Sequence, residues 1–174
     1  MELRRAIEQR RSIRSFKKES VSKQTLQDII NAAIWAPSGS NMQAWHFVVV
    51  SDSEQLEKVK LFAPGLFGDP PALIIISMDM FRAKEKAGKM GYNELVYYDA
   101  ALAGQNMALL ALEYGLGTCF IASFNKLGIK ELLGLPEHIL PYLIISIGYP
   151  DKVPPPPKRR GLSEIISWDK YEGS

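Results

Sequence analysis

Two segments near the start of the chain carry the residue types that bind a phosphorylated molecule with a flat ring. Residues 10–14 read Arg-Arg-Ser-Ile-Arg, and residues 37–45 read Pro-Ser-Gly-Ser-Asn-Met-Gln-Ala-Trp. Guanidinium and hydroxyl groups are the donors that a phosphate needs, while carboxamides can donate and accept along the edge of a heterocycle. Together the two segments predict a bound phosphorylated cofactor.

The basic cluster has a plain geometric reading. If residues 10–14 are extended, Arg10, Ser12 and Arg14 point to one side and could clamp a phosphate. The alternative is a solvated basic turn, because clusters of charge are commonly just surface. A second basic triplet, Lys158-Arg159-Arg160, follows four prolines that favour a stiff polyproline spacer, which would hold the triplet away from the last strand.

The segment 37–41 could be an ordinary connection between a helix and a strand, since Pro, Ser, Gly and Asn are typical of turns. Asn41 and Gln43 favour a ligand instead. Carboxamides just before a buried strand need hydrogen-bond partners, and a ring with carbonyl and imide N–H groups would supply them.

Other kinds of site are not indicated. Cys119 is alone, and neither His46 nor His138 has a second ligand at metal spacing, so we expect no disulfide framework and no metal site. No nucleophile-base pair or pair of carboxylates stands out. We therefore expect no catalytic side chain, with a cofactor carrying the chemistry.

Length and charge narrow the class of protein. A chain of 174 residues with 47% apolar content predicts a single domain, 1–174, with a proline-rich C-terminal arm from residue 150 onward. The 21 basic and 19 acidic residues nearly cancel, so no nucleic-acid partner is expected. The N-terminus lacks the apolar run of a secretory signal, which favours a cytoplasmic location.

Hydrophobic patterns predict alternating helices and strands, and hence a layered α/β or α+β domain around one central sheet. Short helices are expected at 3–9 and 126–133, a clearer helix runs from a cap at Ser22 up to Pro37, and a polar helix begins near residue 53. Strands are expected at 45–50, 72–78, 118–121 and 140–148. We expect residues 81–91 to form an exposed connection or a short mobile helix.

The longest helical stretch runs over residues 92–114, with Gly115 as its stop. It is apolar almost all round, so it must be covered by a core, a membrane or another subunit. Polar residues such as Glu94, Asp99 and Gln105 interrupt it too often for a bilayer span. We therefore expect core plus dimer interface, and no membrane partner.

The order of these motifs resembles the FMN-dependent nitroreductase family over nearly the whole chain. Besides the two segments above, the resemblance rests on Gln105-Asn106, on Gly115-Leu116-Gly117-Thr118 and on Lys158-Arg159-Arg160. It implies an α+β fold with a central mixed or antiparallel sheet flanked by helices, a long central helix, and an intertwined homodimer with FMN sites at the subunit interface.

By the same resemblance, the FMN contacts would come from both subunits. Arg14 would face the pyrimidine end of the ring, Gln43 would lie near the ring, and backbone N–H groups of Ala122 and Ser123 would face its N5 and O4 edge. Arg10, Ser12 and Arg14 would hold the phosphate and ribityl end from one subunit, joined by one or more of Lys158, Arg159 and Arg160. Pro37, Ser38, Ser40 and Asn41 would come from the other subunit, and Arg11, Gln43, Ala122 and Ser123 complete the implied set.

The resemblance also implies an activity. NADH or NADPH would reduce the flavin in a ping-pong reaction, and a small electron-poor acceptor such as a nitroaromatic or quinone would reoxidise it. Two alternatives stay open: other flavin chemistry on the same scaffold, such as dehalogenation or flavin breakdown, and a non-catalytic flavin-binding protein.

Overall fold

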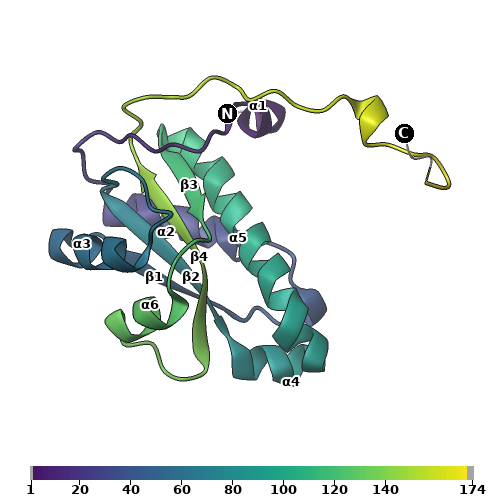
Figure 1. Cartoon of the computed structure of the whole chain (residues 1–174), viewed down its shortest axis with the longest axis horizontal. Helices are drawn as coiled ribbons and strands as arrows, with labels where there is room; N and C mark the ends of the chain where they lie inside the picture. The colour runs from purple at the N-terminus through teal and green to yellow at the C-terminus, as the bar shows by residue number, and fades with distance from the viewer. Residues whose placement is uncertain (1, 172–174) are drawn as a thin grey trace.

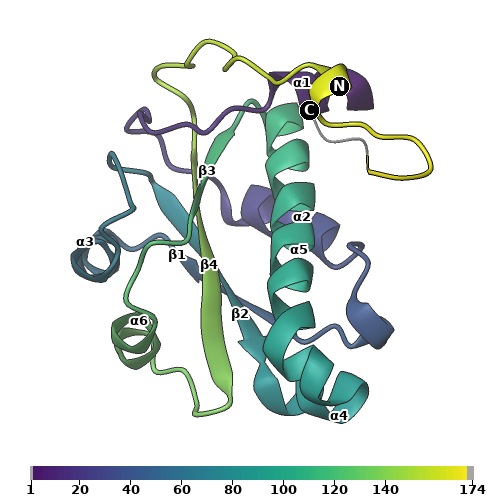
Figure 2. The same cartoon turned by 45° about the vertical axis from the view of Figure 1, so that its right-hand side comes forward.

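The computed structural model describes residues 2–171, and these form one antiparallel sheet with helices on both faces (Figures 1 and 2). The strand order is β1-β2-β4-β3, and every neighbouring pair is antiparallel. The strands are β1 (Trp45–Val50), β2 (Ala72–Asp79), β3 (Gly117–Ile121) and β4 (Ile139–Gly148). The expected α+β class is confirmed, and the sheet is antiparallel rather than mixed.

The central strand β2 is buried along almost its whole length because both faces of the sheet are covered. Its side chains alternate between the two faces, as a strand requires. Ile74 and Ile76 pack into the core beneath α2 (Lys23–Ala33) and α5 (Val96–Ala111), whereas Leu73 and Ile75 pack into a second core beneath the helices of the other face.

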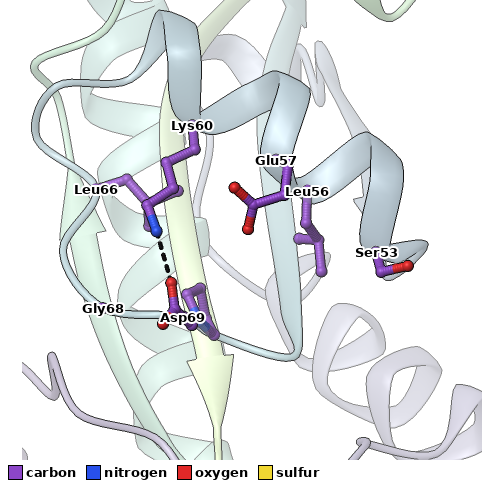
Figure 3. A pocket seen from close by; sticks show the side chains of 8 residues that line it. Ser53, Leu56, Glu57, Lys60, Leu66, Gly68 and Asp69 are labelled. Carbon is purple, nitrogen blue, oxygen red and sulfur yellow. Dashed lines mark hydrogen bonds and ion pairs between the residues drawn. The ribbon is translucent and has the colours of Figure 1, made fainter.

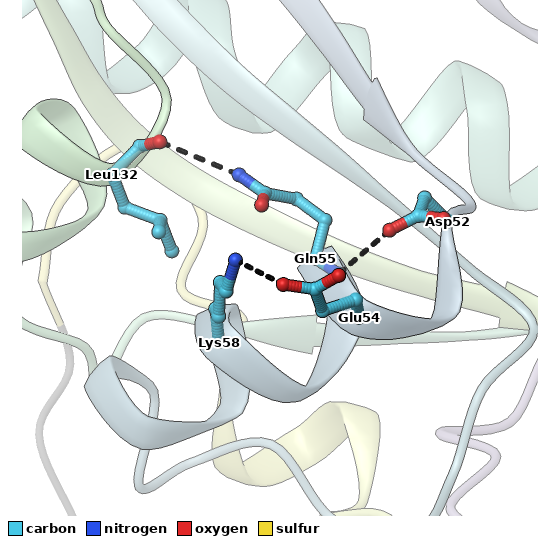
Figure 4. Close-up of polar contacts among 5 residues, drawn as sticks. All are labelled: Asp52, Glu54, Gln55, Lys58 and Leu132. Carbon is cyan, nitrogen blue, oxygen red and sulfur yellow. Dashed lines mark hydrogen bonds and ion pairs between the residues drawn. The ribbon is translucent and has the colours of Figure 1, made fainter.

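Helices α3 (Ser53–Phe62) and α6 (Lys126–Leu132) cover that second face and contact each other (Figure 4). Asp52 caps α3 by accepting a hydrogen bond from the backbone N–H of Gln55, which satisfies a donor that the first helical turn leaves free. The Gln55 side chain donates to the Leu132 carbonyl at 3.3 Å. This contact links the two helices on the side of the sheet away from α5.

The long helical stretch is confirmed, but it is not one uniform helix. A π-turn over Gly91–Leu95 leads into α5, and a short 3₁₀ turn over Leu112–Tyr114 ends it. Gly115 follows in the left-handed region at φ 70°, as expected of a helix stop. Within residues 2–171, no helix has the length and apolar content that crossing a membrane requires.

We expected the segment 81–91 to be either an exposed connection or a short helix. It is helical: α4 spans Met80–Met90, capped by the Asp79 side chain, which accepts from the Arg82 N–H at 2.9 Å. The chain then breaks at Ala87 and Gly88 before the π-turn. Gly88 therefore marks a kink inside a helical segment rather than a loop.

The C-terminal arm passes the N-terminal helix (Figures 1 and 2). α1 (Leu3–Gln9) precedes the basic cluster, and residues 151–171 form an exposed arm that leaves the end of β4 and runs past α1 (Figure 1). Apart from a 3₁₀ turn at Leu162–Glu164, the arm has no regular structure. Residues 172–174 and Met1 lie outside the described residues.

Candidate functional site

The first basic cluster is held in an extended conformation beside β3. Ser12 forms a parallel bridge with Thr118, and the N–H of Ile13 donates to the Thr118 carbonyl at 2.9 Å. Ile13 is buried and anchors the segment, so its neighbours on either side face outward. This confirms the extended geometry expected at the cluster.

The root of the C-terminal arm lies against the same cluster. Lys17 N–H donates to the Tyr149 carbonyl, the Asp151 N–H donates to the Ser15 carbonyl, and the Ser15 hydroxyl donates to the Asp151 carboxylate at 2.9 Å. These bonds fix where the arm starts. They direct its prolines across the guanidinium groups of the cluster.

A cavity of about 280 Å³ lies between the cluster and the arm. It is lined by Arg10, Arg11, Ser12, Arg14, Pro154, Pro155, Pro157 and Arg159. The Arg11 guanidinium already donates to the carbonyls of Glu8 and Arg10. Among the residues that the structure describes, no ion pair neutralises the other three arginines. Three free guanidinium groups around one cavity fit an anion such as a phosphate.

The arm's basic triplet divides between different contacts. Arg159 lines the cavity, whereas Lys158 and Arg160 do not. The Arg160 guanidinium instead lies 3.5 Å from the Glu164 carboxylate and donates to the Glu164 carbonyl. Arg159 is therefore the member of the triplet that this geometry favours for an anion.

A second cavity of about 140 Å³, between α3 and the loop before β2, differs in its charge (Figure 3). Lys60 forms an ion pair with Asp69 across it, and this hydrogen bond holds the pKa of the Asp69 carboxyl below its usual value. Because the two charges on this wall neutralise each other, we do not assign an anion to this cavity.

Ala122 and Ser123 lie at the opposite end of β3 from the arginine cluster, and both are exposed. The four steps along the chain from Thr118 to Ala122 span about 13 Å at the usual rise of a strand. The loop before β2 connects the two places: the Gly65 N–H donates to the Ser123 carbonyl, and Gly68 packs against the Arg14 backbone. One edge of the molecule therefore offers arginines at one end and an exposed loop at the other.

The turn at 37–43 is strained and exposed. Ser40, Asn41 and Gln43 all have positive φ values near 50°, which side-chain-bearing residues rarely adopt. The Gln43 carboxamide donates to the Asn41 side chain at 2.8 Å, and the Ser38 hydroxyl accepts from the Gln43 N–H. Pro37 is also exposed. Strain of this kind is concentrated at ligand-binding sites.

Asp99 of α5 supports this turn through Gly39, although its position in the sequence indicated no role in a site. Its carboxylate is buried, accepts a hydrogen bond from the Gly39 N–H at 3.1 Å, and has a second oxygen without a partner among the described residues. The signal in the sequence was a carboxylate on an otherwise apolar helix. A buried carboxylate without full pairing lowers the free energy of unfolding, so Asp99 is retained at a cost in stability.

Within one chain, the turn and the arginine cluster are far apart. Gly39 contacts Asp99 near the start of α5, while Ser12 pairs with Thr118 beyond its end. The helix from Asp99 to Ala111 alone covers about 18 Å. Figure 2 shows the two segments at opposite ends of α5. One chain therefore brings Arg10, Ser12, Arg14 and Arg159 together but leaves the turn residues at a separate location.

Asp99 predicts a pH dependence of stability. Burial raises the pKa of its carboxyl above the ordinary value of 3.8, and the Gly39 N–H opposes this in part. The folded chain therefore binds more protons than the unfolded chain in this range, so the unfolding free energy falls as the pH rises from 3.8 through the folded-state pKa. Asp99→Asn removes this titration.

We expect the unfolding free energy of Asp99→Asn, relative to the wild type, to increase as the pH rises above 3.8, because only the wild type carries this titrating group. Urea denaturation at a series of pH values measures this difference. A pH-independent difference for Asp99→Asn contradicts the assignment.

The fold and the site define a class: a small α+β protein with a strained turn, a free loop edge and an unneutralised arginine cavity. The family model described as the Nitroreductase family matches residues 7–66 and 58–149. The chain belongs to the nitroreductase family.

Individual relatives agree with this membership. The chain is 32% identical over 160 residues to a putative NADH dehydrogenase/NAD(P)H nitroreductase of Methanothermobacter thermautotrophicus, covering 88% of this chain and 80% of that protein. It is 30% identical over 159 residues to an FMN reductase (NADPH) of Bacillus subtilis, covering 80% of this chain and 62% of that protein.

A solved structure shows the same fold. The NADPH:FMN oxidoreductase from Vibrio harveyi, complexed with NAD⁺, superposes with a TM-score of 0.87 at 25% identity. The match covers 99% of this chain and 79% of that one.

Proposed function

We propose that this protein is an FMN-dependent oxidoreductase that takes electrons from NADH or NADPH and passes them to a small electron-poor acceptor, a nitroaromatic or a quinone. The observation that carries the proposal is the cavity in which Arg10, Arg14 and Arg159 meet without neutralising partners among the described residues. Family membership, and relatives named for FMN and NAD(P)H, support it.

The residues present fit FMN. Arg10, Ser12, Arg14 and Arg159 would hold the phosphate, because guanidinium groups match its charge and geometry. The edge along β3 then leads to the exposed loop at Ala122 and Ser123, whose backbone would face the ring. The stretch of about 13 Å between them suits a cofactor whose phosphate and ring are joined by a ribityl chain.

We further propose that each FMN site is completed by a second copy of the chain. The turn residues Pro37, Ser38, Ser40, Asn41 and Gln43 belong to the implied FMN contacts, yet they lie at the other end of α5 from the arginine cluster of their own chain. A second chain could bring its turn to the first chain's arginines. The homodimer would then contain two equivalent sites, each made from both chains.

The surface of α5 offers a place for that second copy. Tyr98 and Leu102 are exposed along one stripe of the helix, and Trp35 is 79% exposed beside it. An apolar groove of about 380 Å³ continues the stripe towards α1. It is lined by Leu3, Ala6, Ala32, Trp35, Asn106, Leu109, Leu110 and Glu113. Exposed apolar surface of this kind marks a protein interface.

Bound FMN would supply the redox chemistry, accepting hydride from NAD(P)H and passing the electrons to the acceptor. The chain's own groups bind and orient. We assign Arg14 to the phosphate because it lines the arginine cavity, and the backbone N–H groups of Ala122 and Ser123 would face the ring, where fixed donors need little reorganisation as negative charge develops. No side-chain nucleophile or general base is required.

The test is spectroscopic. The purified protein, supplied with FMN, should retain a flavin spectrum, and NADH or NADPH added without air should bleach it. Adding a quinone or a nitroaromatic should then restore the colour. Colour that persists with both donors contradicts the oxidoreductase and favours a flavin-binding protein, while reduced flavin that neither acceptor reoxidises favours other flavin chemistry.

The cytoplasmic location and the single domain stay predictions from the sequence.

A further inference from the structure

The break in α4 gives two lysines a common position that a regular helix would not. Lys84 and Lys89 are five residues apart, so on an ideal helix their side chains would point about 140° apart around the axis. Ala87 has φ −135°, and Gly88 has φ 58° and ψ −146°. A Cβ at Gly88 would meet no atom within 4 Å, so the conformation, rather than crowding, requires glycine here.

After this break, both lysines line one cavity of about 360 Å³ with Tyr92 and Asn93 of the π-turn. The described part of the chain contains no ion pair to either lysine. The Tyr92 side chain is 42% exposed. The cavity therefore combines two free ammonium groups, an accessible aromatic ring and a carboxamide. A π-turn in such a place is typical of a functional site.

The cavity lies on elements that hold the turn at 37–43. Arg82 of α4 donates to the Met42 carbonyl, and Gly39 packs directly against Leu95 of the π-turn. Asp99, one helical turn further along, accepts from the Gly39 N–H. The cavity is thus next to the segment that we have proposed to contact the FMN ring.

We propose that Lys84, Lys89, Tyr92 and Asn93 form the subsite for the adenosine 2′-phosphate end of NADPH, and that this chain therefore prefers NADPH to NADH. The inference rests on the proposed function. A donor whose nicotinamide reaches the flavin must leave its adenosine end elsewhere on the surface, and this cavity is adjacent. Two lysines provide the charge for a phosphate monoester, Tyr92 can stack on a base, and Asn93 can pair with an adenine edge.

The experiment measures kcat and KM for both donors in the FMN-loaded enzyme. Lys84→Gln and Lys89→Gln should each raise the KM for NADPH about five- to tenfold, the effect of one exposed charge on a phosphate, and leave the KM for NADH within about twofold. Lys86→Gln is the matched control: it removes the same charge from the same helix but does not line the cavity. It should change neither value. Lys89→Arg should retain the preference for NADPH.

Gly88→Ala keeps every charge and strains the break, so it should also reduce the preference for NADPH. An equal rise in KM for both donors overturns the 2′-phosphate assignment in favour of the pyrophosphate that both donors share. If Lys86→Gln raises the KM for NADPH as much as Lys89→Gln does, the rise reflects the general charge of the helix. That result also overturns the 2′-phosphate assignment.

Binding of adenosine 2′,5′-bisphosphate to the FMN-loaded protein, measured by calorimetry, tests the pocket without turnover. We expect Lys84→Gln and Lys89→Gln to weaken it, and adenosine 5′-monophosphate to bind more weakly than the bisphosphate to the wild type. Equal binding of the two nucleotides overturns the subsite. If neither NADH nor NADPH bleaches the flavin, the proposed function fails. The calorimetry still shows, independently of turnover, whether the cavity binds the 2′-phosphate.

Discussion

Replacing Arg14 or Arg10 by alanine is expected to weaken FMN binding about 30- to 100-fold, or roughly 2–3 kcal/mol, the scale of a lost charge-assisted contact to a phosphate. Both side chains line the arginine cavity without a carboxylate partner in the described structure. Quenching of FMN fluorescence during titration of the apoprotein measures the dissociation constant. Riboflavin, which lacks the phosphate, should bind the variants and the wild type with similar affinity.

The arm provides a matched pair of controls for this experiment. Arg159→Ala should weaken FMN binding because Arg159 lines the cavity, whereas Arg160→Ala should have little effect because Arg160 is paired with Glu164. Lys17→Ala removes an exposed charge close to the cluster and should also have little effect. Unchanged affinity in both Arg10→Ala and Arg14→Ala contradicts the phosphate assignment.

A charge at Leu102 is expected to separate the two subunits and abolish FMN binding, although Leu102 is far from the arginines. Leu102 is 42% exposed on the apolar stripe of α5, so Leu102→Asp leaves the core of the single chain intact. In a dimer the new carboxylate would be buried without a partner, at a cost of several kcal/mol. Analytical ultracentrifugation gives the mass, and the flavin absorbance gives the bound FMN.

Leu61→Asp is the control, because Leu61 is 81% exposed on α3, on the opposite side of the sheet. It should remain dimeric and yellow. A Leu102→Asp protein that is monomeric but retains FMN would show that one chain suffices for the site.

The fold could be predicted where local patterns and burial agree. The run Ala72–Asp79 is mostly apolar with three consecutive isoleucines, and it forms an interior strand because helices cover both faces of the sheet. The all-round apolar character of residues 92–114 correctly indicated a helix with more than one covered side. The charged segment that follows β2 in the chain, α4, was harder to predict, because Gly88 is equally compatible with a loop and with a kinked helix.

The site could be predicted as residue types but not as an arrangement. The spacing of Arg10, Ser12 and Arg14 in an extended segment was enough to place them together, since alternation along a strand is a local property. The choice of Arg159 over Lys158 and Arg160 depends on Glu164 and on bonds at the root of the arm, and the role of Asp99 depends on a contact with Gly39, 60 residues away in sequence. The contacts at the root of the arm and at Gly39 join residues far apart in the sequence, so they leave no periodic pattern.

Mixing two inactive variants tests most directly whether FMN is held between two chains. One variant carries Arg10→Ala and Arg14→Ala, and the other carries Asn41→Ala and Gln43→Ala. In a mixed dimer, one site would receive both defects and the other would be intact. Equal amounts that are unfolded and refolded together should therefore recover FMN in about a quarter of all sites, since half of randomly paired dimers are mixed. The contradicting result is that dimers shown to be mixed bind no more FMN than the separately refolded variants. One chain would then hold each site alone.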